Sequence, residues 1–149
     1  MKKAIKVVAA IIENDENEIL CALRSPEMSQ ANMSEFPGGK VEKDEDIYTA
    51  LKREINEEVH CHIETIDLFH DHIHEYKNFT INLIAITAII VKGTPTPTEH
   101  SKLIWLKREN LSSLIWAPAD VPAVEQLINQ KEDEANSKGS SSSTFSSIN

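Results

Sequence analysis

The segment FTINLIAITAIIV at 79–91 constrains the fold of this chain more than any other. It is mostly apolar and rich in β-branched residues, which favour strands. Because it lacks regular polar alternation, we expect a central strand that is covered on both faces. Similar patterns predict four further strands, at 7–12, 18–23, 63–76 and 102–107.

Two segments have the periodicity of helices and can cover such a sheet. Apolar residues spaced by four predict a helix over 47–59, and VPAVEQLINQ predicts an amphipathic helix over 121–130 with Pro122 in its first turn. PGG at 37–39 indicates a turn, and GTPTPT at 93–98 indicates a loop. Strands alternating with two helices predict the α/β class, as a sandwich around a mixed sheet.

The 149 residues suit one domain, which we place at 1–130, followed by a flexible Ser-rich tail at 131–149. A net charge of −9 argues against a nucleic acid polymer as partner, and no apolar run reaches the ~18 residues that span a bilayer. The N-terminus lacks a signal-peptide cleavage site, so we expect a cytoplasmic protein in which Cys21 and Cys61 are buried, reduced thiols.

The predicted helix over 47–59 carries a cluster of carboxylates. Glu54, Glu57 and Glu58 share one helical face, near the C-terminal end where the helix dipole disfavours anions. A solvated acidic face is the simple alternative. The unfavourable position and the Gly-Gly pair upstream favour instead a site for a hard divalent cation such as Mg²⁺, which takes carboxylate and phosphate oxygens as ligands.

The spacing around this cluster resembles a known motif. Gly39, five residues, Glu45, seven residues and then REINEE from Arg53 resemble the Nudix box, G-x5-E-x7-R-E-U-x-E-E-x-G-U, where U is aliphatic. The sequence departs from the box at His60, where glycine is expected, and at Cys61. Histidine can adopt the left-handed conformation of that glycine at some cost. The resemblance implies an α/β/α sandwich of the Nudix type.

The resemblance also implies the metal site and the catalytic residues. Mg²⁺, with Mn²⁺ as a possible substitute, would be held by the carbonyl of Gly39 and the three helical glutamates. Arg53 would orient a glutamate, and Glu45 would support the loop. The general base stays open between Glu54, Glu58 and the loop residue Glu99, which also resembles an additional metal ligand; Glu99 as a solvated loop carboxylate is the alternative.

Outside the box, the chain resembles the MutT-like nucleoside triphosphate pyrophosphohydrolases. MSEFPGGK at 33–40 and WAPADVP at 116–122 carry this resemblance. It implies that the substrate contacts Arg24, Phe36, Gly38, Lys40 and Asp120. Asp120 stands where MutT has Asn and related CTP pyrophosphohydrolases have Asp, and it would accept hydrogen bonds from base N–H groups. Its alternative role is the N-cap of the following helix.

The implied reaction converts a (d)NTP and water into a (d)NMP and pyrophosphate. The substrate would be 8-oxo-dGTP or a CTP or dCTP type, in sanitising the nucleotide pool, and the protein would be a monomer or a homodimer. The alternative is a non-catalytic nucleotide-sensing module on the same fold. His70, His72 and His74 alternate along a predicted strand; a zinc site is conceivable there, but a polar strand face is favoured.

Overall fold

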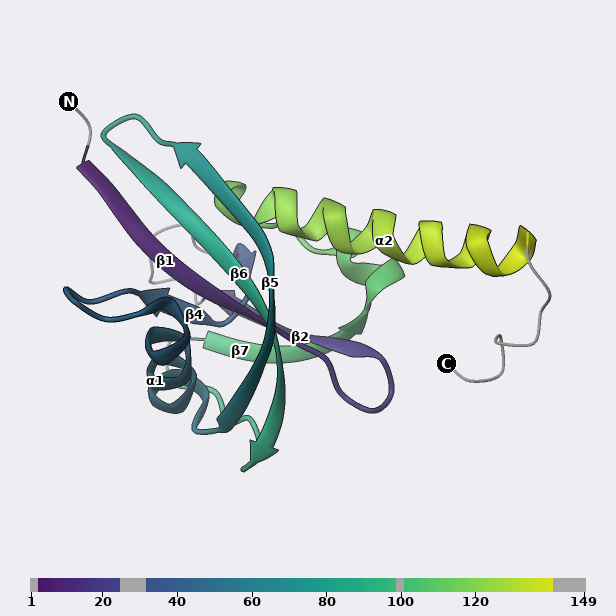
Figure 1. The fold of residues 1–149 in the computed structure, drawn as a ribbon, viewed down its shortest axis with the longest axis horizontal. Coiled ribbons are helices and arrows are strands. Elements are labelled where there is room, and N and C mark those ends of the chain that lie inside the picture. Colours follow the sequence, from purple (N-terminus) through teal and green to yellow (C-terminus); the bar gives the residue numbers. More distant parts are fainter. Residues whose placement is uncertain (1–2, 25–31, 99–100, 141–149) are drawn as a thin grey trace.

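The computed structural model describes residues 3–24, 32–98 and 101–140. Its described strands form a sheet in the order β4-β1-β6-β5 and a smaller sheet in the order β3-β2-β7 (Figure 1). The strands are β1 (Lys3–Ile12), β2 (Glu18–Arg24), β3 (Ser34–Glu35), β4 (Gly38–Lys40), β5 (His62–Glu75), β6 (Phe79–Lys92) and β7 (Ser101–Lys107). The helices are α1 (Ile47–Val59), η1 (Arg108–Ser113), η2 (Pro118–Asp120) and α2 (Val121–Ser140).

The larger sheet is mixed and lies between the two α-helices. β1 pairs parallel with β6 and antiparallel with β4, and β5 pairs antiparallel with β6. On β6, Ile84 and Ile86 belong to the core with α1, whereas Leu83 and Ala85 belong to the core with α2. The predicted sandwich and its central strand are therefore confirmed. The C-terminal end of β6, towards Lys92, is not covered in this way, since Val91 is 53% exposed.

The dipeptide Gly38-Gly39 lies in strand β4, so the turn that we predicted at 37–39 is wrong. Gly38 pairs with Ala9 and Gly39 with Val8 of β1. A Cβ on Gly38 would overlap the carbonyl oxygen of Val8, and one on Gly39 would overlap the carboxylate of Glu54. The glycines are thus needed for close approach to a neighbouring strand and a helix, not for a reversal of the chain.

Helix α2 continues to Ser140, past the boundary that we placed at 130. Residues 141–149 lie outside the described part, and the division into a domain and a tail stays a prediction. Cys21 and Cys61 are buried free thiols, as expected. In the described residues, no helix has the length and apolar character to cross a membrane.

Helix α1 has well-defined ends. The side chain of Asp46 caps its N-terminus by accepting a hydrogen bond from the backbone N–H of Thr49 at 3.0 Å. At its C-terminus, His60 adopts the left-handed conformation with φ 62° and ψ 35°, as expected for the glycine position of the box. The exchange of glycine for histidine therefore leaves the helix end intact but places a Cβ where it is strained.

We predict that His60→Gly raises the free energy of unfolding by about 1 kcal/mol, because glycine adopts this conformation without the Cβ penalty. Urea denaturation followed by circular dichroism measures the change. His60→Ala, which keeps the Cβ, serves as the control and should not stabilise the protein. A glycine variant that is less stable than the wild type would contradict the prediction.

Candidate active site

A cavity of about 280 Å³ opens on the face of the larger sheet that packs against α2. Its apolar side is supplied by β1 and β6, through Val7, Ala9, Ile81 and Leu83. The cavity brings together every substrate-binding residue that we predicted and two of the predicted metal ligands. These are Arg24, Phe36, Gly38, Lys40 and Asp120, with Gly39 and Glu58.

Glu58 supplies the acidic end of this cavity. Burial, followed by the negative charges of Glu35 and Glu54, raises the pKa of the Glu58 carboxyl to about 8, although it accepts a hydrogen bond from the backbone of Gly38. Burial also raises the pKa of Glu54. Negative charges that lie close together at an open site repel one another. A bound divalent cation would offset this repulsion, so the arrangement is suited to a metal site.

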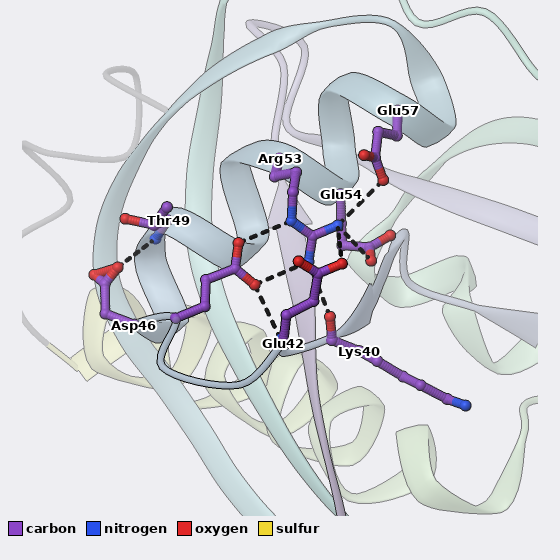
Figure 2. Close-up of polar contacts among 8 residues, drawn as sticks. Lys40, Glu42, Asp46, Thr49, Arg53, Glu54 and Glu57 are labelled. Atoms are coloured by element: carbon purple, nitrogen blue, oxygen red, sulfur yellow. Dashed lines mark hydrogen bonds and ion pairs between the residues drawn. The ribbon is translucent and has the colours of Figure 1, made fainter.

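Arg53 connects α1 to the preceding loop and to strand β4 (Figure 2). Its Nε and Nη2 atoms donate to the two carboxylate oxygens of Glu45 at 2.8 and 2.9 Å, and Nη2 also donates to the carbonyl of Lys40 at 3.1 Å. Its Nη1 atom donates to Glu54 and Glu57, at 3.1 Å each. Arg53 thus holds the loop and the two glutamates in one network.

The predicted metal ligands are only partly brought together. In the described residues, no group of three or more His, Cys, Asp or Glu side chains is arranged to hold a metal ion. Glu54 and Glu57 both point towards Arg53, and the side chain of Glu57 is 62% exposed (Figure 2). Glu58 instead lines the cavity. Glu99 lies outside the described residues.

Asp120 of η2 also lines the cavity. Its Oδ2 atom accepts a hydrogen bond from the backbone N–H of Phe36 at 2.9 Å, across the fold and not from the first turn of α2. Burial, with a smaller contribution from Glu35, raises the pKa of Asp120 to about 7. The ring of Phe36 packs on Trp116 with centroids 4.7 Å apart. The aromatic ring of Phe36 and the buried carboxyl of Asp120 therefore lie next to each other in the cavity.

Glu35 is a cavity residue that the sequence analysis missed. Arg24 Nη1 donates to both of its carboxylate oxygens, at 3.2 and 3.1 Å, while burial raises its pKa. Its negative charge raises the pKa of both Glu58 and Asp120. The sequence did offer one indication. Glu35 directly precedes Phe36, in a segment where Phe36 and Gly38 were already predicted to contact the substrate.

Comparisons with known proteins find similar chains. Residues 7–126 match the family model described as NUDIX domain. The chain is 40% identical over 126 residues to the CTP pyrophosphohydrolase of Escherichia coli K12, covering 85% of this chain and 93% of that one. It is 30% identical over 125 residues to the 8-oxo-dGTP diphosphatase of the same organism, covering 84% and 97%.

Solved structures give the same result. The solution structure of MutT from methicillin-resistant Staphylococcus aureus 252 superposes with a TM-score of 0.71 at 47% identity, covering 87% of this chain and 99% of that one. The fold and the acidic helix define an α/β protein with a candidate site for polyphosphate chemistry. The chain belongs to the Nudix family.

We predict that the Glu45 carboxyl titrates with a pKa of about 2 in the wild type, because Arg53 donates to both of its oxygens. In Arg53→Ala the pKa should return towards the ordinary value of about 4.3. Side-chain carboxyl chemical shifts, followed by NMR against pH, measure it. Lys52→Ala, one residue earlier on α1, is the control, and an equally low pKa in both variants would contradict the assignment.

Proposed function

We propose that this protein is a Mg²⁺-dependent nucleoside triphosphate pyrophosphohydrolase that converts a (d)NTP and water into a (d)NMP and pyrophosphate. The observation that supports this most directly is a cavity whose lining joins two chemically different sets of groups. Glu58 with the glycines of β4 is one set, and Phe36 with Asp120 is the other. A nucleotide has the same division, into a polyphosphate that needs cations and a flat base that needs hydrogen-bond partners.

Residues of α1 and β4 would bind the metal ion and the phosphates. Glu54, Glu57 and Glu58, with the carbonyl of Gly39, would hold Mg²⁺ or Mn²⁺. The bound ion would neutralise phosphate charge and acidify a water molecule. Arg53 would keep the glutamates in position through its hydrogen bonds. Lys40, which lines the cavity, would meet the polyphosphate as a point charge.

The general base is open between Glu54 and Glu58 among the described residues, with Glu99 as the third candidate. Arg53 occupies Oε2 of Glu54, so proton transfer there would involve its other oxygen. Glu58 faces the cavity directly. Both carboxylates belong to the proposed metal site, and either would be able to accept a proton from an attacking water there.

The hydrogen-bonding capacity of Glu35 and Asp120 favours certain bases. Ionised Glu35 and Asp120 only accept hydrogen bonds, so they suit a base that presents N–H groups along one edge. Cytosine presents an amino group, and guanine and 8-oxoguanine present a ring N–H next to an amino group. We therefore propose a CTP or dCTP type of substrate or 8-oxo-dGTP, the substrate classes for which the two Escherichia coli relatives are named.

An 8-oxo-dGTP activity would remove a damaged precursor before a polymerase incorporates it, which is the proposed sanitising role. The cytoplasmic location and the choice between monomer and homodimer stay predictions.

We predict that Glu58→Gln lowers kcat by roughly 10²–10⁴-fold, because it removes either a metal ligand or the general base. Pyrophosphate release with Mg²⁺ measures it, and EDTA should abolish wild-type turnover. Glu64→Gln, an exposed carboxylate on β5, is the matched control. A Glu58→Gln enzyme as fast as the wild type would refute the metal-site assignment. Tight nucleotide binding without turnover, under any divalent metal, would favour the sensing module.

We predict that base preference depends on pH through Asp120, whose pKa is about 7. Above that pH the ionised carboxyl accepts hydrogen bonds from base N–H groups; below it, the protonated carboxyl has lost part of this capacity. The KM for CTP or 8-oxo-dGTP should therefore rise between pH 8 and pH 6. The rise should disappear in Asp120→Asn, and a panel of triphosphates ranked by kcat/KM at both pH values measures it. An unchanged slope in the variant would exclude Asp120 as its cause.

A further inference from the structure

Strand β5 carries a row of rings that the proposed function has not used. The ring centroids of His70 and His72 lie 6.0 Å apart, as do those of His72 and His74. The row continues through Tyr76, 4.6 Å from His74, to Phe79 at the start of β6, 5.0 Å from Tyr76. The three histidines share this row with two other aromatic rings, as a polar and aromatic strand face.

His72 and His74 lie on the sheet face that forms the floor of the cavity. His72 pairs with Leu83 and His74 pairs with Ile81 across the antiparallel ladder of β5 and β6. Directly opposed residues in such a ladder present their side chains on the same face. Leu83 and Ile81 both line the cavity. The two histidines therefore come next to the cavity floor along the sheet.

The two ends of the row have different surroundings. His70 Nδ1 is hydrogen-bonded to Gln126 of α2, and Gln126 Nε2 donates to the carbonyl of Phe69, so α2 covers this end. His72 and His74 are half-buried, and η2, which carries Asp120, packs against β5 and β6. The element that carries Asp120 thus packs against the strand that carries the histidines.

The position fits the dimensions of a nucleotide. Glu58 accepts a hydrogen bond from Gly38 in β4, and the sheet order places β5 three strands away from β4. At about 4.8 Å per strand, this separation is roughly 14 Å. An extended nucleoside triphosphate can cover this span from its phosphates to its base. A base reaching β5 would meet flat rings, on which bases stack without strong sequence preference.

We propose that His72 and His74 are specificity-determining residues that bind the nucleobase where strand β5 adjoins the cavity floor. This inference rests on the proposed nucleotide substrate and adds a second set of base contacts to those of Asp120. Burial and the nearby charges of His70 and His74 lower the pKa of His72, which favours its neutral ring. A neutral imidazole both donates and accepts hydrogen bonds, a capacity that ionised Glu35 and Asp120 lack.

The test measures binding separately from turnover. The Mg²⁺ complexes of α,β-methylene CTP and α,β-methylene 8-oxo-dGTP, which cannot be split between the α- and β-phosphates, are titrated calorimetrically into the full chain. We expect the double variant His72→Ala/His74→Ala to weaken at least one of them by about tenfold. With hydrolysable CTP or 8-oxo-dGTP, KM should rise by a similar factor, while kcat stays within about twofold.

Ile73→Ala is the matched control, since Ile73 lies between the two histidines, is 64% exposed and alternates to the other face. The variant His72→Gln/His74→Gln repeats the test with polar side chains if the alanine variant fails to fold. Unchanged Kd values for both analogues, or an equal loss in Ile73→Ala, would overturn the proposal. So would a wild type that binds neither analogue.

Failure of this inference can be told from failure of the proposed function. Normal pyrophosphate release with unchanged binding in the histidine variants would remove only the histidine assignment. A wild type that binds the analogues and never releases pyrophosphate would remove the enzymatic function, and a loss of binding in the histidine variants would then still support their role.

Discussion

The close approach of strand β4 to both β1 and α1 is the constraint on which the site depends. It requires Gly38 and Gly39, because a Cβ on either would overlap the carbonyl of Val8 or the carboxylate of Glu54. Arg53 then secures the arrangement by bonding the Lys40 carbonyl and Glu45 with one guanidinium group. An acidic helix is thereby held against the end of a short strand, and Glu58 faces the cavity that this strand lines.

The acidity of the chain has a local electrostatic consequence. Burial, together with the negative charges of Glu35 and Glu54, raises the pKa of Glu58, and the fold is what brings Glu35 beside the helix. A net charge of −9 would repel a triphosphate, which is itself an anion. The contradiction disappears if a divalent cation is part of the proposed site, since it would bring opposite charge to both partners.

Local patterns predicted the elements well, and long-range contacts explain what they missed. The helix over 47–59 agrees with its observed bounds because its apolar spacing and its Asp46 cap are properties of neighbouring residues. The glutamates on its face follow from the same periodicity. The strand at Gly38-Gly39 could not be predicted, because the glycines are required by Val8 and Glu54, which are distant in sequence. Glu35 was missed for a similar reason: its importance arises from Arg24, Glu58 and Asp120, which only the fold brings near it.

The architecture separates the parts of the cavity that would choose a base from those that would handle phosphates. Glu58 and the Arg53 network belong to α1 and the loop after β4, whereas Asp120 belongs to η2 and the histidine pair to β5. Between them lies a floor of paired strands, β1 and β6, whose small and aliphatic side chains carry no charge into the cavity. A substitution on η2 or β5 can therefore alter the choice of base without moving a carboxylate of α1.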